Sequence, residues 1–160
     1  MRTLVAGFGN ALRGDDGFGV EVVRRLGMQS LGDDISVIDV GTGGMHLAYE
    51  LLSRYDRVVI VDAMTQGKPA GTLYVREVAS VEPESRIDPH LVLPARALGV
   101  AKALGVLPAS IILIGCEPLD VDELTVELSP AVSSAVDVAV KKILELLDAG
   151  SRAEAHVERR

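Results

Sequence analysis

Short apolar runs alternate with helical patterns along this chain. The runs are rich in valine and isoleucine, as in strands buried on both faces of a parallel sheet, and they span residues 3–6, 35–40, 58–62 and 111–115. Between them, apolar residues recur every three or four positions, which predicts helices over residues 17–28, 44–54, 90–104 and 130–150. Strands that alternate with helices in this way are typical of an α/β fold.

One more strand-like segment, residues 72–78, breaks this alternation. It follows Asp62 after only a loop that contains Gly67, Pro69 and Gly71, which leaves no room for a crossover helix. A parallel neighbour would need a connection of about a dozen residues, so we expect an antiparallel strand at a sheet edge. The pattern therefore predicts a three-layer α/β/α sandwich on a mixed, mostly parallel five-strand sheet with one antiparallel strand.

Length and composition predict a single domain. Residues 1–150 are sufficient to bury one core, whereas residues 151–160 have mixed charges without apolar periodicity, so we expect a charged tail that is frayed or adds a helical turn. The only cysteine, Cys116, excludes an internal disulfide and is typical of a reducing compartment. No apolar run approaches the roughly 18 residues of a membrane span. We therefore expect a cytoplasmic protein without a membrane partner.

The net charge of −7 and the 3% aromatic content bear on the binding of nucleic acids. Proteins that bind nucleic acids need basic patches to neutralise phosphates and often use aromatic side chains as stacking platforms. We therefore expect no nucleic-acid partner.

A glycine-rich loop, residues 7–19, contains the adjacent carboxylates Asp15 and Asp16. The dinucleotide fingerprint would need glycine at the position of Leu12, and no lysine followed by Ser or Thr closes the loop as in a P-loop. Two carboxylates repel phosphate and attract a cation, which favours a metal-binding or catalytic role. Alternatively, one of the two aspartates caps the following helix, and we expect this of one of them.

Three side chains are candidates for one site. Asp16 follows the first strand, Asp62 ends the strand over residues 58–62, and His90 follows a polar, proline-containing loop. Ligands of such sheets bind beyond the carboxyl ends of the strands, so the three side chains can converge there. Oxygen and nitrogen donors without a thiolate suit a divalent ion such as nickel or zinc. In the alternative interpretations, Asp62 caps a turn or accepts backbone N–H bonds, and His90 is an exposed residue at a helix start.

Other candidates have simpler interpretations. We expect His46 on a helix face, His156 in the solvated tail, and Cys116 as a small buried core residue without a nearby base. The loop of residues 41–44 ends the second strand at the same sheet edge. Its backbone is therefore a candidate for pairing with an extended peptide.

Seven segments spread along the chain carry a resemblance to a known family. They are Gly7-Phe8-Gly9-Asn10, Asp15-Asp16-Gly17, Asp39-Val40-Gly41-Thr42-Gly43, Val61-Asp62-Ala63, His90, Gly115-Cys116-Glu117-Pro118 and Glu127-Leu128-Ser129-Pro130. From residue 3 to about residue 147, the chain resembles the hydrogenase maturation endopeptidases. The resemblance implies an enzyme that removes a C-terminal extension from the precursor of a [NiFe]-hydrogenase large subunit after nickel insertion.

The resemblance also implies roles for individual residues. Asp16, Asp62 and His90 match the three metal-contacting positions of the family, and the nickel is supplied by the substrate precursor. Some relatives carry glutamate at the position of Asp16. The family fold is an α/β/α sandwich on a mixed five-strand sheet.

The chain shows no Ser/His/Asp or Cys/His set, so a covalent intermediate does not explain peptide hydrolysis. Our hypothesis is that Asp16, Asp62 and His90 contact the nickel of the substrate, and that a carboxylate, with Asp16 as the catalytic candidate, positions or deprotonates the attacking water. Alternatively, the metal serves recognition only. A different class of function is a non-cleaving nickel-binding chaperone or sensor. A nucleotide-binding enzyme is disfavoured by the Asp15-Asp16 pair.

Overall fold

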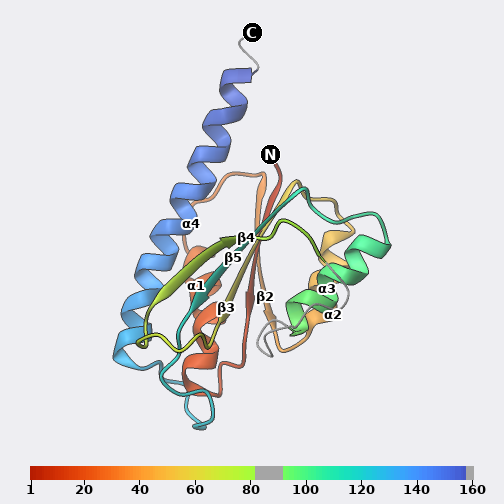
Figure 1. Ribbon diagram of the computed structural model, residues 1–160. Coiled ribbons are helices and arrows are strands. Elements are labelled where there is room, and N and C mark those ends of the chain that lie inside the picture. Colours follow the sequence, from red (N-terminus) through yellow and green to blue (C-terminus); the bar gives the residue numbers. More distant parts are fainter. Residues whose placement is uncertain (82–91, 158–160) are drawn as a thin grey trace.

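The computed structural model describes residues 1–81 and 92–157, with side chains described for residues 1–81 and 93–149. A single five-stranded sheet separates two layers of helices (Figure 1). In chain order the elements are β1 (Thr3–Phe8), the 3-10 helix η1 (Gly14–Gly17), α1 (Phe18–Leu26), β2 (Ile35–Gly41), α2 (Gly44–Leu51), β3 (Arg57–Ala63), β4 (Leu73–Glu77), α3 (Val92–Ala103), β5 (Ser110–Cys116) and α4 (Pro130–Val157).

The strands lie in the order β2-β1-β3-β5-β4. Strand β1 pairs in parallel with β2 and β3, and β3 pairs in parallel with β5, whereas β4 runs antiparallel to β5 at one edge. The predicted three-layer fold, with its antiparallel edge strand, is therefore confirmed. Helix α4 continues through Gly150 to Val157, so the first part of the expected tail is helical.

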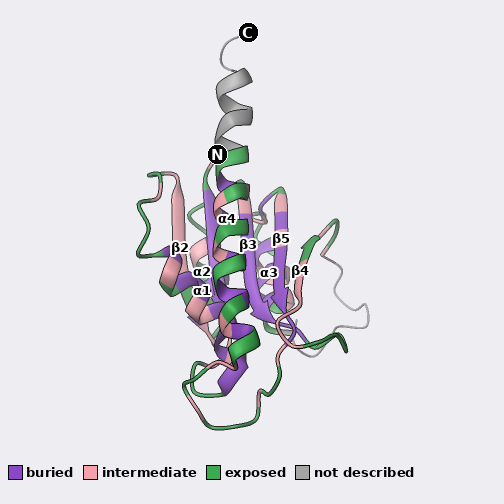
Figure 2. Ribbon diagram, turned by 90° about the vertical axis from the view of Figure 1, so that its left-hand side faces the viewer, coloured by how far each residue is buried: buried purple, intermediate pink, exposed green. Residues whose placement is uncertain are grey.

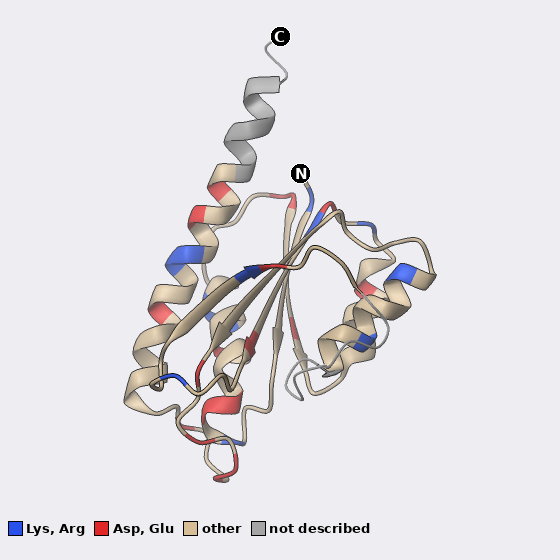
Figure 3. Ribbon diagram, viewed as in Figure 1, with Lys and Arg blue, Asp and Glu red and all other residues tan. Residues whose placement is uncertain are grey.

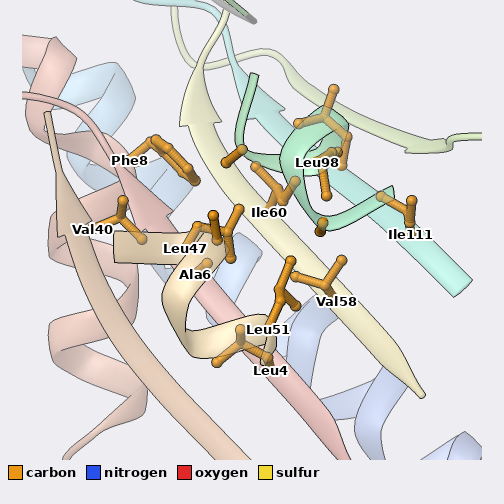
Figure 4. Close-up of a cluster of buried hydrophobic side chains, with 14 of the residues drawn as sticks. Leu4, Ala6, Phe8, Val40, Leu47, Leu51, Val58, Ile60, Leu98 and Ile111 are labelled. Atoms are coloured by element: carbon orange, nitrogen blue, oxygen red, sulfur yellow. The ribbon is translucent and has the colours of Figure 1, made fainter. Parts of the chain in front are cut away.

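Apolar side chains cover both faces of the sheet. Helices α2 and α3 pack over one face, where Leu51 and Ile60 lie in a core shown in Figure 4. Helices α1 and α4 pack over the other, where Val22 and Ile143 are fully buried. In Figure 2 the central strands β3 and β5 are mostly buried, and the edge strands β2 and β4 are more exposed. This burial on both faces explains why the sequences of the central strands consist of consecutive apolar residues.

Two local features shape the carboxyl edge of the sheet. A Cβ atom on Gly19 of α1 would lie 2.3 Å from the carbonyl oxygen of Val61 and 2.4 Å from that of Phe8, so only glycine permits this approach of helix to strands. At the end of β2 the register skips Val40, and Gly41 adopts a positive φ of 57°. Such a bulge redirects the chain at the carboxyl edge of the sheet.

Within the part of the chain that the structure describes, none of the helices combines the length and the apolar character needed to cross a bilayer.

Candidate functional site

A cleft of about 160 Å³ lies at the carboxyl ends of β1, β2 and β3. Its lining comes from five separate segments of the chain and consists of Phe8, Gly9, Asp16, Gly41, Thr42, Asp62 and Leu93. The structure thus brings Asp16 and Asp62, which are distant in sequence, to one cleft. This edge of the sheet is where the topology of an α/β fold places ligands.

Asp16 is half-buried in η1, directly after the β1 loop. Its Oδ2 accepts a hydrogen bond of 2.8 Å from the backbone N–H of Asn10, and the side chain of Asn10 in turn accepts one from Leu12. Gly9 has a φ of 125°, and a Cβ atom there would lie 1.8 Å from the carbonyl oxygen of Asp16. The glycine-rich loop therefore folds tightly around Asp16 and fixes its carboxylate.

Asp62 is only 6% exposed, near the end of β3. Val58 and Ile60 precede it at alternate positions and belong to the core under α2 and α3, so Asp62 lies on the same face of the sheet. A carboxylate at such a position costs free energy unless it has polar partners. Its place beside Asp16 in the cleft is consistent with a polar site there.

His90 lies outside the described residues, and so does the side chain of His156. Leu93, three positions after His90 in the sequence, lines the cleft. Among the residues that the structure describes, no group of three His, Cys, Asp or Glu side chains is arranged to hold a metal ion. The three-residue metal set therefore stays a prediction, of which the structure places two members together.

Asp15 has a different environment from Asp16. It is 2% exposed, and its carboxylate accepts hydrogen bonds from the backbone N–H of Leu119 (2.8 Å), from that of Ser129 (2.7 Å) and from the hydroxyl of Ser129 (2.8 Å). Asp15 thus holds both ends of the segment between β5 and α4.

The prediction that one of the two aspartates caps the following helix is wrong. Gly17 occupies the cap position of α1, without a side-chain hydrogen bond to the helix. The 3-10 turn of η1 directs Asp15 to the β5–α4 connection and gives Asp16 the amide of Asn10 as its partner. Neither carboxylate therefore bonds to the first turn of α1.

Glu117 is a buried acidic residue to which the sequence assigned no role. It is 3% exposed and accepts hydrogen bonds from the backbone N–H groups of Gln66 and Gly67 and from the hydroxyl of Tyr74. Burial by itself raises the pKa of Glu117, but the hydrogen bonds from Tyr74 and from the amides of residues 66–68 outweigh it and leave the pKa below its ordinary value. Burial and the neighbouring Glu117 raise the pKa of Tyr74 to about 12.

The signal for Glu117 was available in the sequence. It is a carboxylate directly after a buried strand, the same pattern that drew attention to Asp62. Its partners in the β3–β4 loop, however, are about 50 positions away and follow from the path of that loop.

Cys116 is buried, as expected, with an exposure of 1%. Burial, with smaller contributions from the charges of Asp15 and Glu117, raises the pKa of its thiol to about 12. The thiolate that a nucleophile requires is therefore disfavoured. His46 lies exposed on α2, which agrees with its expected place on a helix face.

Comparisons with known proteins agree with this arrangement. The model of the hydrogenase maturation protease family matches residues 20–155. The chain is 32% identical over 151 residues to the hydrogenase 2 maturation protease of Escherichia coli strain K12, which covers 92% of this chain and 91% of that protein.

Solved structures give the same result. The hydrogenase maturating endopeptidase HybD from E. coli superimposes with a TM-score of 0.83 at 29% identity, covering 94% of each chain. A hydrogenase 2 maturation peptidase from the Thaumarchaeota archaeon SCGC_AB-539-E09 is 37% identical, with a TM-score of 0.73 and coverage of 92% of this chain and 99% of that one. From the family model and the identity to the E. coli protease, we conclude that this chain belongs to the hydrogenase maturation protease family.

Proposed function

We propose that this protein is an endopeptidase that removes the C-terminal extension of a [NiFe]-hydrogenase large-subunit precursor, and that it recognises the nickel already inserted in that precursor. The observation that carries the proposal is the meeting of Asp16 and Asp62 in one cleft at the carboxyl edge of the sheet. Membership of the hydrogenase maturation proteases supports peptide hydrolysis and the precursor as substrate.

Carboxylate oxygens, together with the imidazole of His90, are suitable donors for a divalent ion such as nickel. One oxygen of Asp16 is engaged by Asn10, and a carboxylate has a second oxygen with which it can contact a metal ion or a water. In this proposal the precursor brings the nickel, and Asp16, Asp62 and His90 contact it only when it is in place. Cleavage is thereby restricted to precursors that have received their metal.

The hydrolytic step needs an activated water, because the buried Cys116 is disfavoured as a nucleophile. We assign Asp16 to this step as the group that orients the water or accepts its proton. Its hydrogen bond to the β1 loop holds the carboxylate in one orientation, which favours catalysis by positioning.

The test compares Asp16→Asn and Asp62→Asn with the unmodified enzyme on a purified precursor, with and without nickel. Both variants should lose processing of the nickel-loaded precursor, because an amide is a poor metal ligand and a poor base. In Asp16→Asn the new side chain retains an oxygen that can accept the bond from the backbone N–H of Asn10, so the fold should persist. Mass spectrometry of the precursor measures cleavage, and circular dichroism checks folding.

Asp33→Asn is the matched control, since it removes one negative charge from an exposed loop. Normal processing by Asp16→Asn would refute its catalytic role. Equal cleavage of nickel-free and nickel-loaded precursor would refute nickel recognition. If the unmodified protein binds the loaded precursor without shortening it, the function is that of a chaperone or sensor.

A further inference from the structure

The connection between β5 and α4, residues 117–129, exposes apolar side chains that the fold does not use. We call it the β5–α4 loop. Leu124, Val126 and Leu119 are 81%, 73% and 70% exposed and are the three most exposed large apolar side chains among the described residues. Leu12, from the loop after β1, is 62% exposed, and its carbonyl accepts the N–H of Thr125. Exposed apolar groups that gather in this way mark interaction sites.

The same loop also carries acidic side chains. The β5–α4 loop contains no lysine or arginine, and Figure 3 shows its acidic positions at one end of the molecule. Four of its carboxylates are exposed, namely Asp120, Asp122, Glu123 and Glu127. With the neighbouring Arg13 included, the surface is still strongly negative. Its charge and its apolar groups together fit a partner segment that combines basic and apolar side chains.

This surface is held in one shape by the structure beneath it. Asp15 binds the loop at Leu119 and Ser129, near its two ends. The side chain of Asp120 accepts the amides of Asp122 and Glu123 and so closes a turn within it. A hollow of about 260 Å³ opens between the acidic side chains of the loop and Asp15. A preformed surface loses little conformational entropy when a partner binds.

The same surface is joined to the segment that carries Asp16. The N–H of Gly14 donates to the carbonyl of Thr125 at 2.8 Å, and Arg13 and Thr125 form a parallel β-bridge. Gly14 and Asp15 directly precede Asp16 in η1. A partner bound to the β5–α4 loop is therefore positioned by the same backbone that positions the proposed catalytic carboxylate.

From these observations we propose that the β5–α4 loop and Leu12 form a docking surface for a basic and partly apolar segment of the large-subunit precursor, separate from the nickel that enters the cleft. This inference rests on the proposed function for the identity of the partner. It adds a second contact region, which determines affinity for the precursor, while the Asp16 cleft determines cleavage.

The experiment measures kcat and KM for cleavage of nickel-loaded precursor, and the dissociation constant of the complex. One variant, Leu124→Ser with Val126→Ser, removes the exposed apolar groups. A second, Asp122→Lys with Glu123→Lys, reverses the charge at side chains whose carboxylates are exposed. For both variants we expect KM and the dissociation constant to rise about tenfold or more with kcat nearly unchanged, because docking contacts act on binding and not on the chemical step.

Matched controls are available elsewhere on the surface. Leu104→Ser with Val138→Ser removes apolar side chains that are each 57% exposed, on other elements. Asp33→Lys with Asp148→Lys reverses two exposed charges away from the loop. These controls should leave KM unchanged. The rise in KM and in the dissociation constant caused by Asp122→Lys with Glu123→Lys should also become smaller as the salt concentration rises from about 0.05 to 0.5 M, because salt screens exposed charges.

An unchanged KM and dissociation constant in both loop variants would overturn the docking proposal. It would also be overturned if the loop variants turned a dimer of this chain into monomers without an effect on precursor binding, because the occupant would then be a second copy. If the unmodified protein binds the precursor but cleaves none, the proposed function fails. In that case a weaker complex with the loop variants still supports the docking surface.

Discussion

Asp15 and Asp16 are adjacent and chemically identical, yet the structure separates their roles. Asp15 is buried and accepts hydrogen bonds from residues 104 and 114 positions away, whereas Asp16 is half-buried and lines the cleft. Burial and donor geometry, more than residue type, therefore assign one carboxylate to the scaffold and place the other at the cleft. Glu117 belongs with Asp15, because its hydrogen bonds hold the β3–β4 loop in place.

Replacing Glu117 by glutamine should destabilise the protein in a pH-dependent manner. The pKa of Glu117 is below its ordinary value, so its ionised form stabilises the folded state above the unfolded pKa of about 4.3, and this stabilisation is lost as the pH falls through the folded pKa. At neutral pH we expect a loss of about 1–3 kcal/mol, because the amide NH₂ would face N–H and O–H donors. Urea unfolding at several pH values measures the difference.

The difference in the free energy of unfolding between Glu117→Gln and the unmodified protein should become smaller as the pH falls. Gln66→Ala is a suitable control, because it keeps the backbone N–H that bonds to Glu117 and alters only an exposed side chain. This difference in unfolding free energy could instead stay constant from neutral pH to about pH 3. Such a result would show that the charge of Glu117 contributes nothing to stability.

At the level of elements, the parallel strands were predictable to within two residues. Their valine and isoleucine runs are buried on both faces and leave little ambiguity, and the short β3–β4 connection excluded a parallel β4. The end of α4 was less predictable. Residues 151–157 lack an apolar stripe, but they include alanine, glutamate and arginine, whose high helix propensity suits the continuation of α4 beyond Gly150.

Part of the candidate site was predictable, because the topology of the sheet alone determines that Asp16 and Asp62 lie at the same edge. Asp16 follows β1 and Asp62 lies near the end of the neighbouring parallel strand β3, and the carboxyl ends of these strands must share one edge of the sheet. The partners of Asp15 and Glu117 were not predictable. They depend on how long loops return to the sheet, and a pattern of residue types along the chain does not contain that information.

Helix α1 approaches the sheet closely at Gly19. Gly19→Ala would place a methyl group against two backbone carbonyls, which cannot move aside independently, so we expect a loss of about 1–3 kcal/mol. Gly99→Ala in α3 is the matched control. A Cβ atom there meets nothing within 4 Å, so the change should stabilise the helix by about 0.5–1 kcal/mol. Thermal unfolding of both variants measures the contrast, and equal shifts would contradict it.

In the whole molecule, one sheet divides two apolar cores. Strand β1 contributes Leu4 to the core under α2 and α3, and it contributes Val5 to the core under α1 and α4. Because successive side chains of the same strands enter opposite cores, a disruption of the strands exposes both cores at once. The two layers should therefore unfold together.

Leu51→Ala and Ile143→Ala test this coupling, since each removes a fully buried side chain from one core. Each should cost about 2–5 kcal/mol. In urea, tyrosine fluorescence, which includes the buried Tyr55 of the α2 side, should follow the same transition as far-UV circular dichroism in both variants. Separate transitions in either variant would show that the layers unfold independently.

The thiol of Cys116 is shielded from solvent in the folded protein. The chain has a single thiol, it is 1% exposed at the end of β5, and its pKa is raised to about 12. Alkylating reagents will therefore react with it mainly in molecules in which the core under α1 and α4 has transiently opened around it. The rate of that modification under native conditions reports how often the packing around the end of β5 opens, without any engineered label.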